Sequence, residues 1–368
     1  MGGIRRKMGS NVTNLTTAID AYPAAFRGNR LNLLFLDDAQ PIFSSQKFLK
    51  EVDSMELQED RREYLIGDKD GWPFPTISIE SRPDPWTITE ALFNNFEIAE
   101  KVLPTQRDIG KILTEHVSKK KPDVIILNIV DGLSYYDLPD DMDAIPCLVR
   151  GVTTTDFGFR DVIGKPAISQ RLFSLGYKNQ LAFTFFDTDA KPLSNELHSA
   201  FGNSQLNRIN SIEECIDMIR DNPFWRGYIQ IVAPGLDKLA HYHPDRPMIK
   251  ETLAGIFERL QKVVDSVSSK GRRVAAYLTS DHGILWRDYA KEKTKVVGDL
   301  FSEDMVHPRY INGSLPRSYA RTVRLERFSY TLLKAPYMTR DWKHSEWGVH
   351  GGISAWESIV PIIIKEIG

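Results

Sequence analysis

Asp281 and His282 come directly after an apolar run, in the stretch TSDHGILW that spans residues 279–286. The run VAAYL before them is typical of a buried strand, and Gly283 after them allows a sharp turn. A carboxylate and an imidazole are both ligands that zinc accepts. We therefore expect a metal site here, provided that other strand ends contribute the remaining ligands.

Four more residues of these two types follow or flank apolar runs elsewhere. Asp131 ends the run in NIVDG, Asp237 and His241 follow QIVAP, and His350 lies within WGVHGG. The spacing of Asp237 and His241 places both side chains on one face of a helical turn. Each residue taken alone has an ordinary explanation, as a turn, a surface pair or a tight loop. Their joint occurrence at strand ends favours a metal centre.

The elements that must position these residues predict a doubly wound α/β fold. Strands are expected over 123–132, 181–187, 227–234, 273–281 and 358–365. Helices are expected over 168–177, 212–221 and 248–270. This alternation predicts a mostly parallel sheet with helices on both faces, and such sheets carry their sites at the carboxyl ends of the strands.

Residues 1–120 are expected to form a separate N-terminal region that is mixed and largely helical. It would begin with a weakly structured arm, followed by a strand over 30–38 and a helix over 44–66. Helical spacing continues over 87–119, with an interruption at Pro104. Residues 121–368 would form the catalytic domain, which contains a long insertion over 284–349.

The composition excludes several classes of protein. The 368 residues carry a formal net charge of −2, so no overall basic field exists to hold nucleic acid. Two cysteines in unrelated contexts exclude a disulfide framework and a cysteine-based zinc site, and they suit a reducing cytosol. The apolar runs are too short to cross a bilayer, and the basic, polar N-terminus lacks the apolar core of a signal peptide. We expect a cytoplasmic protein without membrane contacts.

With these residues in this order, the chain resembles the alkaline phosphatase superfamily. Within that superfamily, the stretch HGGISAWESIVPIII at 350–364 is most similar to PglZ-domain proteins, and the resemblance covers roughly residues 121–368. It implies an alkaline phosphatase-like fold and two divalent metal ions, with zinc as the first choice and manganese as the second. One ion would be held by Asp131, Asp281 and His282, and the other by Asp237, His241 and His350.

The same resemblance implies a hydrolase of phosphate esters. The expected activity is that of a phosphodiesterase or nuclease acting on nucleotides or nucleic acid, in prokaryotic anti-phage defence, with other defence proteins as candidate partners. Two alternatives stay open. One is a phosphomonoesterase or phosphomutase, and the other is a non-catalytic scaffold of a defence complex whose metal site is structural.

The nucleophile is expected in GVTTTDFGFRDVIG, residues 151–164, at the start of a helix. Members of the superfamily carry Thr-x-Thr before a helix, with the second threonine attacking, which implies Thr155 in this chain. Thr154 is the alternative, one position earlier. The amide groups at a helix start can also bind phosphate.

The insertion contains an arginine-rich stretch at 307–328. Two interpretations are open: a solvated helix face, or a lid that binds substrate phosphates through Arg317 and Arg321. The histidines without a partner in any motif are His116, His198, His243, His307 and His344.

Overall fold

The computed structural model describes residues 84–184, 207–297 and 307–367, apart from positions 95, 97–98, 101–102, 140–141, 143, 210–211, 221–224, 234–235, 243–244, 246–247, 269–270, 316 and 326. Before residue 84 it describes only two strands, β1 (Val12–Asn14) and β2 (Leu65–Gly67), which pair antiparallel. The strand expected over 30–38 lies outside the described residues. So does the helix expected over 44–66, except for Leu65 and Ile66, which belong to β2.

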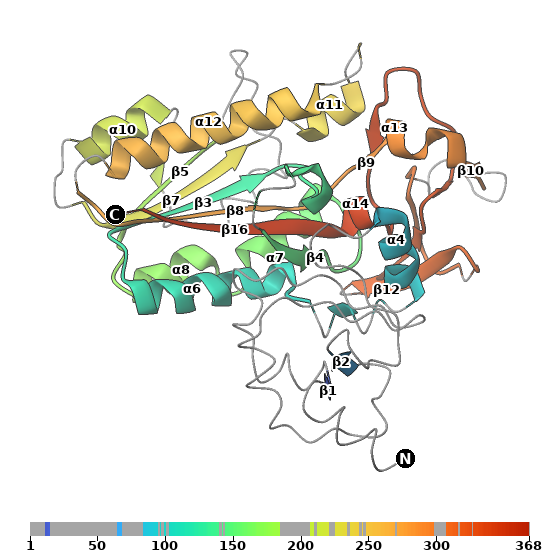
Figure 1. The fold of residues 1–368 in the computed structure, drawn as a ribbon, viewed down its shortest axis with the longest axis horizontal. Helices are drawn as coiled ribbons and strands as arrows, with labels where there is room; N and C mark the ends of the chain where they lie inside the picture. The colour runs from blue at the N-terminus through green and yellow to red at the C-terminus, as the bar shows by residue number, and fades with distance from the viewer. Residues whose placement is uncertain are drawn as a thin grey trace.

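A seven-stranded mixed sheet forms the centre of the protein (Figure 1). Its spatial order is β4 (Ile145–Leu148), β16 (Ile359–Ile367), β8 (Val274–Ser280), β3 (Val124–Val130), β7 (Gly227–Ala233), β5 (Asn179–Thr184) and β6 (Asn207–Arg208). The strands from β8 to β6 pair parallel with their neighbours. β16 pairs antiparallel with both β8 and β4. The five predicted strands that lie in this sheet are confirmed, and the last of them runs against the others.

Helices cover both faces of the sheet. Figure 1 shows α10 (Ile212–Arg220), α11 (Leu236–Tyr242) and α12 (Ile249–Ser268) on one face, and α6 (Ile109–Lys120), α7 (Thr155–Ile163) and α8 (Ile168–Ser174) on the other. Val124 and Ile126 of β3 pack in the cluster that includes α12, whereas Ile125 and Leu127 pack with α6, α7 and α8. All of β3 is buried, as expected for a strand covered on both sides. The predicted doubly wound α/β fold is confirmed.

Several shorter elements extend from the carboxyl edge of the sheet. They are η4 (Tyr135–Asp137) after β3 and α14 (Ala355–Ser358) before β16, together with α4 (Pro85–Asn94) and η3 (Gln106–Asp108) on either side of the break expected at Pro104. None of the described helices is both long and apolar enough to span a membrane.

The insertion contains mostly strands. Its elements are β9 (Leu285–Trp286), α13 (Arg287–Ala290), η5 (Lys291–Lys293), β10 (Lys295–Val296), β11 (Tyr310–Asn312), β12 (Ala320–Leu325), β13 (Phe328–Leu333), β14 (Tyr337–Met338) and β15 (Gly348–Val349). β11, β13 and β12 form a three-stranded antiparallel sheet. The interpretation of the arginine-rich stretch as a helix face is therefore wrong. The residues of β12 alternate between more and less buried positions, as in a strand with one packed face.

Gly158 permits a close approach between α7 and the end of β8. A Cβ atom at this position would overlap the carbonyl oxygen of Asp281, which is backbone and cannot turn aside. The contact brings the first turn of α7, which begins at Thr155, beside Asp281 and His282. The spacing between the helix and the sheet is thus set by the absence of one methyl group.

We expect Gly158→Ala to destabilise the protein by about 1–3 kcal/mol, the usual cost of forcing extra volume into a packed region. The matched control is Gly255→Ala in α12, where a Cβ meets nothing within 4 Å. That substitution should be neutral or stabilising, because alanine favours a helix over glycine by about 1 kcal/mol. Urea denaturation of both variants measures the difference, and equal effects would contradict this account of Gly158.

Candidate metal centre

Six side chains from four connections meet at the carboxyl edge of the sheet. We call Asp131, Asp281 and His282 the first group and Asp237, His241 and His350 the second group. The first group follows β3 and β8, and the second comes from α11 and from the loop after β15. The rings of His282 and His350 stack at a centroid distance of 4.2 Å, so the two groups adjoin.

In the first group, the Nε2 atom of His282 faces two carboxylates. It lies 3.6 Å from Oδ1 of Asp131 and 3.5 Å from Oδ2 of Asp281. His282 and Asp281 are completely buried. The three ligand atoms lie within 4.8 Å of one another, a separation compatible with a shared metal ion.

In the second group, three ligand atoms lie still closer together. Oδ1 of Asp237 is 3.3 Å from Nε2 of His241 and 3.2 Å from Nε2 of His350. The two Nε2 atoms are 2.9 Å apart. The predicted spacing of Asp237 and His241 on one helix face thus directs both side chains towards His350.

Backbone carbonyl groups orient the two buried imidazoles. Nδ1 of His350 lies 2.9 Å from the carbonyl oxygen of Thr153, and Nδ1 of His282 lies 3.1 Å from that of Gly283. A carbonyl only accepts, so each Nδ1 must donate its proton, and in the neutral ring each Nε2 then carries a lone pair. Both lone pairs point towards carboxylates, an arrangement that metal-binding histidines commonly show.

Three buried carboxylate oxygens also have no hydrogen-bond partner within the described part of the chain. They are Oδ1 of Asp131, Oδ1 of Asp237 and Oδ2 of Asp281. Such atoms are costly to bury unless a cation compensates them. Mixed nitrogen and carboxylate ligands are the set that zinc accepts, so these residues fit the divalent ions implied by the sequence.

The charges in both groups are strongly perturbed. Burial, together with Asp281 and Asp237, raises the pKa of Asp131 well above its usual range. Burial also acts to raise the pKa of Asp237, but the charge of His350 and the contact with His241 hold it well below its usual range. Burial lowers the pKa of His282, whereas in His350 the attraction of Asp237 outweighs burial and raises the pKa. The raised pKa values of Asp131 and His350 favour bound protons, which partly compensate the charge of the carboxylates. A divalent ion bound here would displace such protons.

The three threonines before α7 have distinct environments. Thr155 is the first residue of the helix, and its Oγ1 lies 3.2 Å from Nε2 of His282. Thr154 is the N-cap and makes no side-chain capping hydrogen bond. Thr153 is buried, and its Oγ1 accepts a hydrogen bond of 2.8 Å from the amide of Gly351. Thr155 is therefore the threonine whose hydroxyl reaches the first group, while Thr153 supports the loop that carries His350.

Sequence reasoning missed several residues that hold the first group in place. Nε2 of Gln106 donates to the carbonyl oxygens of Ser280 and Asp281, at 2.8 and 2.5 Å. The amide of Gly132 donates to Oδ1 of Asp281 at 3.1 Å, which leaves Oδ2 free to face His282. No motif marks Gln106, because it lies in a different segment from the residues it binds.

A buried ion pair between Arg309 and Glu357 supports the second group. Nε and Nη2 of Arg309 donate to the two oxygens of Glu357 at 3.1 and 2.8 Å, and both side chains are 0% exposed. Glu357 also accepts from the amide of Gly352 at 3.0 Å and from the hydroxyl of Ser354 at 2.7 Å. The pair ties the insertion to the loop that follows His350.

Of the two arginines expected to bind substrate, Arg321 lies in the three-stranded sheet of the insertion and Arg317 lies just before it. The guanidinium of Arg321 is 5.6 Å from the centre of the Phe96 ring, so this side chain faces the segment after α4. Arg317 pairs with Ala320 in an isolated bridge just before β12. The interactions described for these two residues do not include a contact with either group.

The remaining histidines are dispersed. Nδ1 of His116 lies 2.5 Å from the hydroxyl of Tyr277, and Nε2 lies 2.7 Å from Oε1 of Glu366. These contacts join α6 to two strands of the sheet. His344 is exposed, and His307 lies beside the second group. Burial, together with His350 and His241, lowers the pKa of His307 to about 2. His198 and His243 lie outside the described residues.

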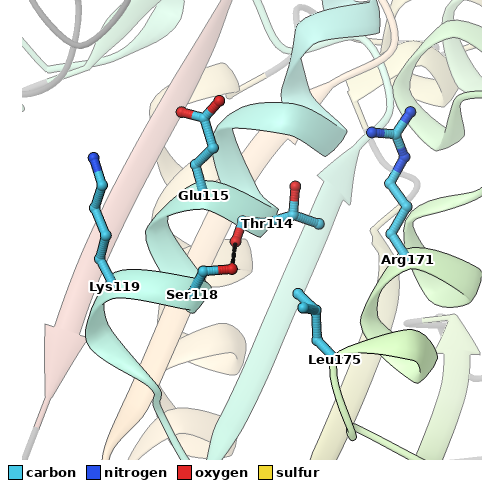
Figure 2. Close-up of a pocket in the computed structure, with 6 residues that line it drawn as sticks. All are labelled: Thr114, Glu115, Ser118, Lys119, Arg171 and Leu175. Atoms are coloured by element: carbon cyan, nitrogen blue, oxygen red, sulfur yellow. Dashed lines mark hydrogen bonds between the residues drawn. The ribbon is translucent and has the colours of Figure 1, made fainter.

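A separate surface groove between α6 and α8 has a volume of about 510 Å³ (Figure 2). Two of its polar side chains form hydrogen bonds with nearby backbone groups. The hydroxyl of Ser118 donates to the carbonyl of Thr114, and Nε of Arg171 donates to that of Pro166. The groove contains none of the six residues of the two groups, and we assign no chemistry to it.

No protein-family model matches the chain, and no curated protein matches it either. Among solved structures, murine ectonucleotide pyrophosphatase/phosphodiesterase 5 is similar with 10% identity and a TM-score of 0.40, over 65% of this chain and 87% of that one. The zinc complex of the C-terminal periplasmic domain of Escherichia coli EptC is similar with 10% identity and a TM-score of 0.29, over 45% of this chain and 64% of that one. Streptococcus pyogenes phosphoglycerol transferase GacH is similar with 10% identity and a TM-score of 0.30. This similarity covers 48% of this chain and 67% of that one. Similarities this weak establish neither family nor activity.

We expect the purified protein to bind up to two divalent ions, and Asp281→Ala or His350→Ala each to lower this number. Each substitution removes one ligand, from the first and the second group respectively. Elemental analysis after incubation with zinc measures the effect, with exposed His344→Ala as the control. Uptake should also weaken as the pH falls, and at the second group this should begin above the ordinary imidazole pKa of about 6.5, because the pKa of His350 is raised and its protonated ring competes with the ion. Unchanged metal content in both variants would rule out this centre.

Glu357→Gln should destabilise the protein by about 3–5 kcal/mol, because it leaves the buried Arg309 charge without its partner. The control is Glu90→Gln, which removes an exposed ion pair with Lys334 at 2.8 Å. Exposed pairs contribute at most about 1 kcal/mol. Thermal and urea unfolding of both variants distinguish the two cases, and a loss in Glu357→Gln no larger than in the control would show that the pair is dispensable.

Proposed function

We propose that this protein is a two-metal-dependent hydrolase of phosphate esters, of the phosphodiesterase or nuclease type, acting on nucleotides or nucleic acid. One observation carries the proposal. A threonine hydroxyl at a helix start lies 3.2 Å from an imidazole of one carboxylate–histidine group, and a second such group adjoins it. A hydroxyl beside two candidate metal sites suits phosphoryl transfer.

We assign Thr155 the role of nucleophile, with the first group and the second group as ligands of one divalent ion each. When bound, such ions favour the alkoxide form of a hydroxyl and balance the negative charge of the phosphoryl group. Thr155 would attack phosphorus, forming an oxygen–phosphorus bond while the bond to the leaving alcohol breaks. The leaving oxygen takes up a proton, and water then releases the phosphate from Thr155.

The start of α7 supports the same assignment. Asp281 and His282 are brought against this helix by the close approach at Gly158. The free amide groups of its first turn are donors for phosphate oxygens. A phosphoryl group held there would lie next to Thr155, so that attack requires little rearrangement.

The finer assignments rest on the sequence resemblance. They are the PglZ family, the alkaline phosphatase-like arrangement, a role in anti-phage defence and the cytoplasmic location. Arg317 and Arg321 stay proposed contacts for an extended substrate, because a nucleic acid strand carries phosphates beyond the one that reacts.

We expect Thr155→Ala to lower turnover by a factor on the order of a thousand or more, as is usual when a nucleophile is lost. The substrates are bis(p-nitrophenyl) phosphate, a diester, and p-nitrophenyl phosphate, a monoester, each assayed with zinc and with manganese. Metal content should change little, because three other ligands remain in the first group. The ratio of the two rates separates a phosphodiesterase from a phosphomonoesterase.

Thr154→Ala is the matched control and should keep most of the activity. If Thr154→Ala is the inactive variant instead, the attacking residue lies one position earlier. Full activity in both variants would exclude attack by threonine. A wild-type protein that binds metal but cleaves neither ester would favour the non-catalytic scaffold.

A further inference from the structure

His307 lies next to the second group without belonging to it. Its ring centre is 5.5 Å from that of His350, with the two planes inclined by 52°. Among the described residues it belongs to neither convergent set of ligand atoms, and unlike His241, which also lies outside those sets, it makes no contact with an aspartate. The mechanism proposed above therefore leaves unused an imidazole at the edge of the centre.

The ring of His307 is held in a fixed position. It stacks on Tyr310 with centres 4.6 Å apart and planes inclined by 21°. The amide of His307 donates to the carbonyl of Tyr310 at 3.0 Å, and its own carbonyl accepts from the hydroxyl of Thr339 at 2.9 Å. Side chains held at both the ring and the backbone lose little freedom when they bind a ligand.

Glycine at position 351 makes room for this ring. Gly351 has a φ of +112°, and a Cβ there would lie 2.6 Å from the Tyr310 ring and 3.2 Å from Nδ1 of His307. Any larger residue would displace the stacked pair from the residue next to His350. The loop that supplies a ligand of the second group is thus shaped to admit His307.

The two nitrogens of His307 differ in their surroundings. Nδ1 is buried and has no hydrogen-bond partner among the residues that the structure describes, although the residue as a whole is only half-buried. Nδ1 stays unpaired in either tautomer, but an unpaired buried N–H is rarer in proteins than an unpaired buried acceptor, so the proton of the neutral ring is assigned to Nε2. His307 therefore presents an N–H donor at the edge of the metal centre.

We propose that Nε2–H of His307 donates a hydrogen bond to an oxygen of the substrate phosphoryl group, which makes His307 a substrate-binding residue contributed by the insertion. The inference rests on the proposed function, because it assigns a partner to the ester bound at the two groups. A donor to an anionic oxygen strengthens binding more than one to a neutral oxygen.

The test compares three substitutions at this one position. His307→Phe keeps a stacking ring and removes the donor, His307→Gln places an amide near the former Nε2, and His307→Asn places it near Nδ1. We expect kcat/KM for bis(p-nitrophenyl) phosphate to fall about tenfold to hundredfold in the Phe variant. The Gln variant should retain more activity than the Asn variant. Inhibition by orthovanadate should weaken in the same order, while metal content and Tm stay at wild-type values. His344→Phe, at an exposed histidine of the same insertion, is the control and should behave as wild type.

Three results would overturn the inference. Loss of bound metal in His307→Phe would make His307 a ligand, and equal activity of the Gln and Asn variants would exclude a donor at Nε2. Wild-type kinetics in the Phe variant would show that the ring only packs. In each case the wild-type protein is still an active esterase, so the proposed function is unaffected. An inactive, metal-loaded wild-type protein would remove the proposed function and this inference together.

Discussion

Buried carboxylate oxygens of three aspartates converge at one edge of the sheet, and the surrounding contacts are explained by the need to hold and compensate them. Asp131 and Asp281 are buried and Asp237 is half-buried, and at such positions like charges repel strongly and unpaired oxygens are costly. One oxygen of each of these aspartates has no hydrogen-bond donor among the described residues. The protein turns the lone pairs of His282 and His350 towards them, which is stable only when protons or cations lie between. The capacity of the centre to bind a cation follows from the placement of imidazole lone pairs beside carboxylates.

The surrounding contacts keep these groups from relaxing apart. Gln106 binds the end of β8, Thr153 binds the loop after His350, and the Arg309–Glu357 pair joins that loop to the insertion. Every one of these contacts joins segments that are distant in sequence. Ligands held by such a network lose little freedom when an ion binds, which favours a defined coordination geometry.

The sequence predicts the parts of this arrangement that depend on local pattern. An apolar run that ends in Asp131 or in Asp281–His282 identifies both a strand and the residues at its carboxyl end. The direction of β16 is not predictable in this way, because strand composition says nothing about which neighbour it meets. The strands of the insertion could not be predicted for a different reason. In ARTVRL, the placement of Arg321, Val323 and Leu325 on one face is a two-residue period, yet arginine and leucine are also common in helices. Arg309 and Glu357 could not be paired at all, because a salt bridge between distant segments leaves no local signal.

β16 has a consequence for how the chain reaches its folded state. Among the described strands, β16 is the one that pairs with β4 in the sheet, and Leu148 pairs with Ile359, more than two hundred residues later, while an isolated bridge joins Leu148 to Thr105 on its other side. During synthesis, β4 can therefore pair with β16 only after almost all the described residues have left the ribosome. Contacts between such distant segments slow folding, because a large loop has to close before they form. The strands β3, β7 and β5 can assemble earlier, so one side of the sheet is able to mature before the other.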